Sequence, residues 1–491
     1  LPMKLTQFVN IWLLFVTSVL AVQPFKKVWE NTQYSRVIDV GKSFVKERHD
    51  IQVTNIDSEP AIQYLFGLPK HMSSDATLVV AIYATKDGKR ALLKPQKIPV
   101  QDEDLTYFDL KFPYPIAPGS TFEFILSFMI TNQMVPYPEH IPMEKTQVIK
   151  LNTYAYPLTS YDTISYSLDI ANTKSVTELN LDDLPILFEK VENERSVSFV
   201  ASDSIEGNTV YDFTFTYPRN LPLTYINYLQ RDLWVSHWSN TLQLEEYYEL
   251  TNHGAKLDKG FSRSKYMTES IANKPHHAIT ALRIPFDYSK ALQYDSIYYV
   301  DKVGNVSTSQ YYENELIIRP RFPIFGGWNY NFTIGWDYKL DQFVKQQDDE
   351  YIITTKILDG IQDSTYDKVN FTIYLPEGAE LLDYALPFAV AEPTITNQYS
   401  YLDVESGHLK VTFEFENLVD EMKNLSIVIR YKYTTYAMLH KPLHAAFYIF
   451  LALMGLYVLK KIDLSIKPNE KSDNIESEEV GIIDKDEKSE N

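Results

Sequence analysis

The sequence predicts a mostly β protein, with two tandem antiparallel β-sandwich-like domains followed by one transmembrane α-helix. Three observations predict it. Long stretches alternate apolar and polar residues with a period of two, as strands with one buried face do. Tyr and Phe, which favour strands, number 36 and 26, whereas Gly numbers only 16 among 491 residues. Finally, a pattern in the first half of the chain recurs in the second half.

Charge and composition exclude several classes of protein. The chain has 46 Lys and Arg against 65 Asp and Glu, a net charge of −19, which argues against nucleic-acid binding because no basic face is available in bulk. A hydrophobic content of 45% is typical of a globular protein with a large core. Cysteine is absent, which excludes disulfides, thiolate metal sites and a cysteine nucleophile.

The N-terminus carries an apolar stretch over residues 8–22, preceded by Lys4. A basic residue, an apolar segment and small residues at its end are typical of a secretory signal peptide. We therefore expect a signal peptide over residues 1–21, cleaved near Ala21, with Met3 as the true start. A buried helix is the alternative interpretation.

A second apolar run, Leu443–Leu459, lies near the other end and contains one ionisable residue, His444. At about 1.5 Å per residue it spans about 26 Å, close to the roughly 27 Å hydrocarbon thickness of an endoplasmic reticulum membrane. Lys460 and Lys461 follow it, which favours a cytosolic C-terminus. We expect a transmembrane helix over 442–459, a type I orientation and a disordered acidic cytosolic tail over 460–491. A buried core helix is the alternative.

The region between these ends, residues 22–441, alternates apolar and polar residues over most of its length. Ser160-Tyr161-Asp162 and the strand-like segment after it recur 205 residues later as Thr365-Tyr366-Asp367 and a similar segment. Since 205 is nearly half the length of this region, we expect two related luminal β domains, domain I over 22–230 and domain II over 231–441. The clearest strand patterns cover residues 330–338, 369–375 and 425–433.

Asn-x-Ser/Thr sequons indicate N-glycosylation if the chain enters the secretory pathway. None of them has Pro at the middle position, and three fall on the polar faces of predicted strands. We expect two or more to be glycosylated. The four candidates are Asn305, Asn331, Asn370 and Asn424.

Catalytic patterns are missing from the sequence. It has no His-Glu-x-x-His, no Gly-x-Ser-x-Gly, no phosphate-binding loop and no Gly-x-Gly-x-x-Gly, so we expect no catalytic residue, no cofactor and no metal site. The pair His276-His277 follows Lys274-Pro275, which predicts an exposed turn rather than a metal pair. Glu246 points to the apolar face of its predicted strand, and we expect it to be buried and held by an Arg or a Tyr.

Two segments, 231–263 and 318–331, are dense in Trp, Arg and Gly. Both strongly resemble the ribophorin I family, as do Tyr137-Pro138-Glu139-His140 and the segment 375–380. The resemblance covers the whole region between the two ends and the membrane helix, and the short tail is similar to the fungal members. The residues that carry this signature are Arg231, Trp234, His237, Trp238, Arg319, Arg321, Gly326, Gly327 and Trp328.

The resemblance implies a non-catalytic subunit of the eukaryotic oligosaccharyltransferase complex, a single-pass type I glycoprotein of the endoplasmic reticulum membrane. That complex transfers a preassembled glycan from dolichyl diphosphate to Asn of Asn-x-Ser/Thr in nascent chains, and its active site is on another subunit. The implied partners are the other subunits, including the catalytic one, nascent polypeptides and the translocon. The implied role is to scaffold the complex and help present acceptor chains. From the surplus of Tyr and Phe we expect an acceptor chain to bind by aromatic contacts or edge-strand addition.

Two other classes of protein share these features. A type I cargo receptor or adhesion protein would have the same topology, strands and sequons. A luminal hydrolase that uses an unrecognised pair of carboxylates is the enzyme alternative.

Overall fold

The computed structural model describes residues 26–85, 87–99, 104–268, 276–286, 291–312, 314–388, 390–400, 403 and 407–462. The predicted signal peptide lies outside the described residues, as does the predicted tail from residue 463 onward. The chain forms two compact units, one ending at Met438 and the other beginning at Leu439.

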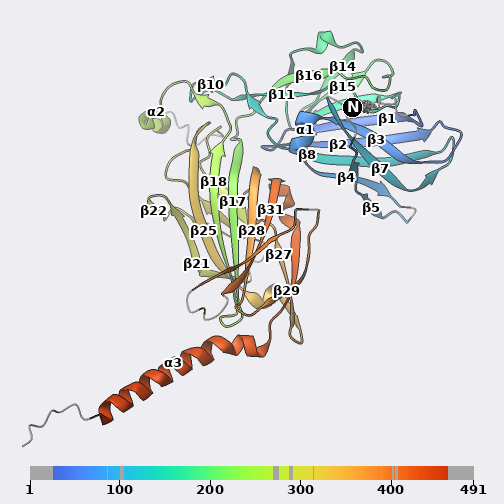
Figure 1. Cartoon of the computed structure of the whole chain (residues 1–491). Helices are drawn as coiled ribbons and strands as arrows, with labels where there is room; N and C mark the ends of the chain where they lie inside the picture. Colours follow the sequence, from blue (N-terminus) through green and yellow to red (C-terminus); the bar gives the residue numbers. More distant parts are fainter. Residues whose placement is uncertain are drawn as a thin grey trace, which may run out of the picture. The chain divides into compact units, whose positions relative to one another are not determined.

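A large sheet of eight strands dominates the first half of the chain, in the order β14-β15-β12-β1-β2-β8-β4-β5 (Figure 1). Its central strand β1 pairs antiparallel with β2 and parallel with β12. The strands are β1 (Trp29–Asp39), β2 (Val45–Asn55), β4 (Ala76–Ala84), β5 (Arg90–Leu93), β8 (Thr121–Ile130), β12 (Tyr166–Ala171), β14 (Phe188–Glu192) and β15 (Ser196–Ala201).

Two smaller sheets complete this half. Their buried aromatic and aliphatic side chains share one core with those of the large sheet. One sheet contains β3 (Ala61–Pro69), β7 (Leu105–Ile116) and β6 (Gln96–Lys97). The other contains β13 (Thr177–Glu178), β16 (Asp212–Pro218), β11 (Val148–Tyr154) and β9 (Val135–Pro136). Two short helices, α1 (Lys70–Asp75) and η1 (Leu181–Asp183), lie between strands.

A second eight-stranded sheet forms the next part of the chain, in the order β30-β31-β28-β17-β18-β25-β21-β22 (Figure 1). Strand β17 pairs antiparallel with β18 and parallel with β28, as β1 does with β2 and β12. The strands are β17 (Thr224–Ser236), β18 (Thr241–Asn252), β21 (Leu292–Asp301), β22 (Gly304–Asn305), β25 (Asn329–Lys339), β28 (Ser364–Leu375), β30 (Thr394–Gln398) and β31 (His408–Val419).

Smaller sheets pack on this one around a second core. One contains β20 (Leu282–Pro285), β24 (Glu315–Ile318) and β23 (Gln310–Tyr312). The other contains β26 (Val344–Gln347), β27 (Glu350–Lys356), β32 (Ser426–Lys432) and β29 (Glu380–Ala385). Apart from α3, the other elements of the described residues are α2 (Arg263–Thr268), η3 (Leu340–Gln342), η4 (Asp420–Asn424) and the pair β10 (His140–Ile141) with β19 (Lys256–Leu257).

The two large sheets have the same strand order, because β14, β15, β12, β1, β2, β8, β4 and β5 correspond in turn to β30, β31, β28, β17, β18, β25, β21 and β22. The 205-residue repeat of the sequence relates β12 to β28, which are the parallel neighbours of the two central strands. The predicted β architecture is therefore confirmed, with one parallel pair at the centre of each large sheet. The boundary predicted at 230/231 falls inside β17, and the division into two domains stays a prediction.

Strand periodicity explains the placement of most elements. The three clearest predicted strands are confirmed as β25, β28 and β32. Residues of β25 and β32 alternate between buried and more exposed positions over most of their length, whereas β28 is buried on both faces except over residues 367–370. In β25, for example, Tyr330, Phe332, Ile334 and Trp336 are all buried. The alternation directs one face of each strand into the core and leaves the other face to carry polar groups.

Helix α3 (Thr435–Lys461) contains the predicted apolar run and is long and apolar enough to cross a membrane. It begins at Thr435, before the predicted start at 442, and it continues through Pro442 to Lys460 and Lys461. Its apolar side chains are exposed, as a lipid-facing helix requires. The predicted helix is confirmed.

Candidate functional site

A buried ion pair lies at the centre of the first large sheet. Arg36 donates hydrogen bonds from Nε and one terminal nitrogen to the two carboxylate oxygens of Glu47, at 2.9 and 2.8 Å. Its other terminal nitrogen donates to the main-chain oxygen of Tyr154 at 2.6 Å. Burial alone would raise the pKa of Glu47, but the charge of Arg36 and the hydrogen bonds from His49 and Arg36 together hold this pKa at about 2.

A second buried ion pair lies at the centre of the other large sheet and confirms the prediction for Glu246. Arg231 contacts the carboxylate of Glu246, and it also contacts Asp359 Oδ2 at 2.7 Å. Tyr248 donates its hydroxyl to Glu246 Oε2 at 2.6 Å. Burial raises the pKa of Glu246 despite the attraction of Arg231, and the second carboxylate adds to this rise.

The two ion pairs occupy different positions in the repeat. Arg36 lies beside Leu168 of β12, whereas Arg231 lies beside Phe371 of β28. The 205-residue offset makes Phe371 the counterpart of Tyr166, which lies beside Tyr34. The buried arginine of the second sheet is therefore two residues earlier along its central strand than that of the first sheet.

The prediction that His276 and His277 form an exposed turn is wrong, because both side chains are buried. Their rings stack 4.2 Å apart and pack against Phe325. His276 accepts a hydrogen bond at Nδ1 from the amide of Ala278, so its proton is on Nε2, which lies 2.7 Å from the main-chain oxygen of Met143. Neither ring nitrogen of His277 has a hydrogen-bond partner among the described residues.

The first signature segment supplies packing contacts. The indole of Trp234 stacks on the ring of Tyr374 with centroids 3.8 Å apart, and His237 Nε2 lies 2.9 Å from the hydroxyl of Tyr431. Burial lowers the pKa of His237 to about 4, so this imidazole is neutral at neutral pH. Trp238 is 58% exposed and donates its Nε1 hydrogen to the main-chain oxygen of Met438.

The second signature segment joins strands that are distant in sequence. Arg321 donates from Nε to Asp301 at 2.6 Å and from a terminal nitrogen to the main-chain oxygen of Asn305 at 3.0 Å. Arg319 and Arg321 are both exposed. Gly327, at a φ of 78°, donates its amide to Asn252, and Trp328 packs edge-on against Phe325. These signature residues therefore support the fold.

Gly326 is required by close packing of main chain against main chain. A Cβ at this position would lie 2.2 Å from the main-chain oxygens of both Gly254 and Ala255. Such a distance is far below van der Waals contact, and a main-chain oxygen cannot move aside as a flexible side chain would. Only glycine fits here.

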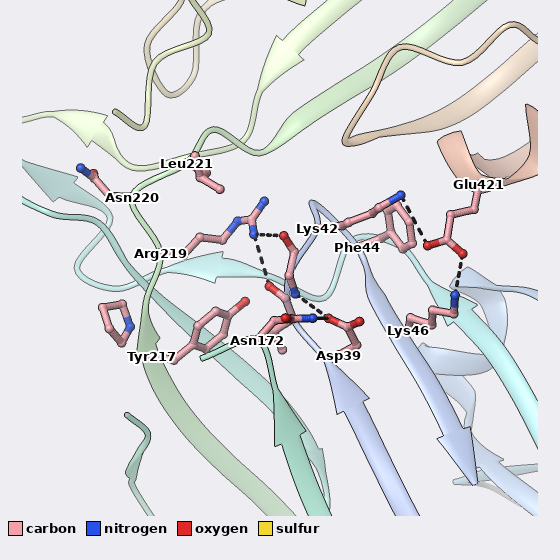
Figure 2. Close-up of a pocket in the computed structure, with 13 residues that line it drawn as sticks. Asp39, Lys42, Phe44, Lys46, Asn172, Tyr217, Arg219, Asn220, Leu221 and Glu421 are labelled. Atoms are coloured by element: carbon pink, nitrogen blue, oxygen red, sulfur yellow. Dashed lines mark hydrogen bonds and ion pairs between the residues drawn. The ribbon is translucent and has the colours of Figure 1, made fainter. Parts of the chain in front are cut away.

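A groove of about 520 Å³ lies where the first and second halves of the chain meet (Figure 2). The loop between β1 and β2 forms one of its walls, and residues 217–221, from the end of β16 into the connection to β17, form another. Lys42 and Lys46 each contact Glu421, at 3.4 and 2.7 Å, across the groove. Arg219, which is buried, pairs with Asp363 at 2.9 Å.

The charges of this groove are therefore used to join the two halves. Lys42 also reaches Asp420 at 3.0 Å, and Phe44 packs in the core of the second half. Burial raises the pKa of Asp420, although Lys42 opposes this shift. We interpret the groove as a charge-paired seam, because each of its three cations has a carboxylate partner. Sequence analysis missed it, since its partners lie more than 140 residues apart.

The four sequons have different surroundings. Asn305 in β22 and Asn424 at the end of η4 are exposed. Asn331 and Asn370 are half-buried, and their side-chain amides donate to the hydroxyls of Tyr247 and Tyr228, both at 3.0 Å. The structure holds no cluster of three or more His, Asp or Glu side chains placed to bind a metal, within the residues it describes.

These features of the described residues define a class of protein: a large, β-rich region built on a repeated sheet, followed by one helix that can cross a membrane. The ribophorin I family model matches residues 29–460, which includes both large sheets and nearly all of α3. The chain belongs to the ribophorin I family.

Several curated relatives match over nearly the whole chain. A Caenorhabditis elegans protein named dolichyl-diphosphooligosaccharide–protein glycosyltransferase subunit 1 is 28% identical, covering 95% of this chain and 78% of its own. Subunit 1B of the same enzyme from Arabidopsis thaliana is 26% identical over 93% of this chain and 98% of its own. Subunit 1 from Schizosaccharomyces pombe is 23% identical over 84% and 90%.

Solved structures add no argument about the fold. A two-domain M1 zinc metallopeptidase bound to tryptophan matches at 12% identity, over 43% of this chain and 49% of its own, with a TM-score of 0.25. A related enzyme from Deinococcus radiodurans matches with a TM-score of 0.24 at 13% identity, over 43% and 48%. These scores are too low to establish a shared fold.

Replacing Gly326 by alanine tests the close approach of main chain described above. We expect Gly326→Ala to lower the free energy of unfolding by about 1–3 kcal/mol, because the added methyl group overpacks the site. Gly260→Ala is the matched control, since a Cβ there meets nothing within 4 Å. Urea unfolding of the full-length chain in detergent, followed by tryptophan fluorescence, measures both. Equal stabilities of the two variants would contradict the interpretation.

Replacing His277 by phenylalanine tests how burial affects stability at low pH. Burial lowers the pKa of His277 to about 4 from 6.5, so between pH 6.5 and pH 4 the unfolded chain binds a proton that the folded chain does not. The native protein should therefore lose up to about 3 kcal/mol of stability across this window. We expect His277→Phe to remove this part of the loss, with pH 7.5 as the reference condition. An unchanged pH dependence would refute the assignment.

Proposed function

We propose that this chain is a non-catalytic subunit of the oligosaccharyltransferase complex, which transfers a preassembled glycan from dolichyl diphosphate to Asn of Asn-x-Ser/Thr in nascent chains. One observation carries the proposal: the family match extends from β1 into α3, over residues 29–460. Relatives in worm, plant and fission yeast that match 84–95% of this chain are named subunit 1, or subunit 1B, of that enzyme.

A structural role for the buried acids supports the non-catalytic assignment. General acid or base catalysis needs a carboxyl group that can reach a substrate. Glu47 and Glu246 are both buried and both bound by an arginine of the same sheet. The signature residues likewise make packing contacts. We infer that this chain positions other molecules within the complex and that another subunit carries the catalytic residues.

The proposed location is the endoplasmic reticulum membrane, with the β-rich region in the lumen. Lys460 and Lys461 at the end of α3 favour a cytosolic C-terminus by the positive-inside rule. In this orientation all four sequons are luminal. The proposed partners are the other subunits of the complex and, on the luminal side, acceptor polypeptides. The translocon is a further proposed partner.

The mechanism we propose is positional. Two related β domains, joined between β16 and β17 and fixed to each other by the charge-paired seam, form a rigid luminal scaffold. Lys42, Lys46 and Arg219 on one side of the seam meet carboxylates on the other side at 2.7–3.4 Å. A scaffold of this kind can hold an acceptor chain near an active site on a neighbouring subunit.

Affinity purification of the tagged full-length chain in mild detergent tests the function. We expect the other subunits of the complex to co-purify, together with glycan transfer to a sequon peptide. An unrelated single-span membrane protein of the endoplasmic reticulum, purified in parallel, is the control. Recovery of the chain without these subunits would overturn the proposal and favour a cargo receptor or adhesion protein.

Sequon occupancy tests the orientation and the surroundings of each asparagine. We expect Asn305 and Asn424 to carry glycans, because a glycosylated asparagine must reach solvent in the folded protein. Asn331 and Asn370 are half-buried with their amides donated to tyrosines, so we expect less glycan there. Asn305→Gln should remove one endoglycosidase-sensitive mass step, and Asn331→Gln is the comparison. A chain without any glycan would contradict the luminal orientation.

A further inference from the structure

The strand at one end of the second large sheet, β30, has a free edge. It pairs with β31 on one side, and within the described part of the chain no strand lies on its other side. All five of its residues are exposed, from Thr394 to Gln398. In an antiparallel pair, alternate residues direct their N–H and C=O groups away from the partner strand. The edge of β30 thus presents main-chain donors and acceptors to solvent.

This edge also lacks the protection that natural proteins give to exposed edges, which is usually charge. The residues of β30 are Thr, Ile, Thr, Asn and Gln. Every other end strand of four or more described residues either carries a charge or is largely covered. Charges are found on β5, β14, β20, β26 and β29, and β3 is the largely covered one.

We propose that the free edge of β30 binds an extended polypeptide as an additional β-strand, and that the bound segment is acceptor polypeptide awaiting glycosylation. The proposal rests on the proposed function above and identifies where that function contacts its acceptor. Main-chain hydrogen bonds are available in every sequence, which suits a surface that meets many different nascent chains. Five residues offer an edge of about 17 Å.

The composition of β30 favours a transient guest over a permanent partner subunit. Obligate interfaces are more apolar than transient ones and resemble a domain core. On β30 only Ile395 is apolar, and it is 50% exposed. The absence of charge also matters in a chain with a net charge of −19, because acidic acceptor segments meet no repulsion from the strand itself.

The neighbouring face of the sheet adds a preference for certain side chains. Thr396 lies beside Lys410 of β31, Lys410 lies beside Tyr374 of β28, and Tyr374 lies beside Trp234 of β17. Lys410 Nζ lies 5.7 Å from the centre of the Tyr374 ring, which stacks on Trp234. A guest residue beside Thr396 therefore shares a face with one cation and two aromatic rings. An aromatic side chain is favoured there.

Site-specific photocrosslinking tests this edge. Benzoylphenylalanine replaces Ile395 in β30 or, as the matched control, Val191 in the charged end strand β14; these two side chains are 50% and 44% exposed. The probe is an extended peptide in which Gln replaces the sequon Asn, so that it cannot be glycosylated. We expect adducts at position 395 and at least about tenfold fewer at position 191.

A second peptide separates strand addition from side-chain contacts without altering the protein. N-methylation of alternate backbone nitrogens removes the donors that a β-strand uses and keeps the side chains, so we expect about a tenfold loss of adduct. Equal labelling by the methylated peptide, or equal labelling at position 191, would overturn the proposal. An adduct between position 395 and another subunit in place of the peptide would also overturn it, because a permanent partner would then cover the edge.

The measurement is made on the full-length chain in detergent and on the purified complex. Failure to recover the complex overturns the proposed function and, with it, the identity of the guest as an acceptor for glycosylation, whereas strand addition at the edge of β30 is still tested on the full-length chain. Absence of the adduct at position 395 in a complex that glycosylates a sequon peptide overturns the edge site alone.

Discussion

Each large sheet depends on a charge pair buried beside its central parallel strands. Arg36 with Glu47 and Arg231 with Glu246 are almost fully removed from solvent, and each arginine is bound by a carboxylate on the neighbouring strand. Removing one partner of such a pair costs about 3–5 kcal/mol, because a buried charge is left without compensation. The chain has no cysteine, so packing around these pairs holds the sheets together without covalent help.

The seam between the halves extends this use of paired charge from the cores to the junction. Its cations contact carboxylates that belong to the other half, and Phe44 of the first half packs in the second core. The signature residues of the family make similar contributions inside the second half, by ion pairs, stacked rings and a glycine that permits close main-chain packing. Each of these contacts joins segments that are separated in the sequence, as the scaffolding role proposed above requires.

Local patterns of the sequence predicted the strands, the membrane helix and the inward direction of Glu246, because alternation and apolar length are properties of short segments. The same alternation places Arg36 on the apolar face with Tyr34 and Ile38, so the burial of Arg36 was also predictable from the sequence. His276 and His277 were wrongly expected to be exposed, because Met143, which covers His276, lies more than 130 residues away in the sequence. The seam was unpredictable for the same reason, since Lys42 and Asp420 are 378 residues apart.

The two-residue displacement between the buried arginines has a consequence for folding. Two sheets of identical strand order in one chain invite misassembly, in which a strand of one repeat inserts into the other. If β1 took the place of β17, its arginine would lie two residues away from the position that Glu246 and Asp359 surround, and the three charges would be buried apart. The offset therefore makes each central strand, β1 or β17, a poor substitute for its counterpart in the other sheet.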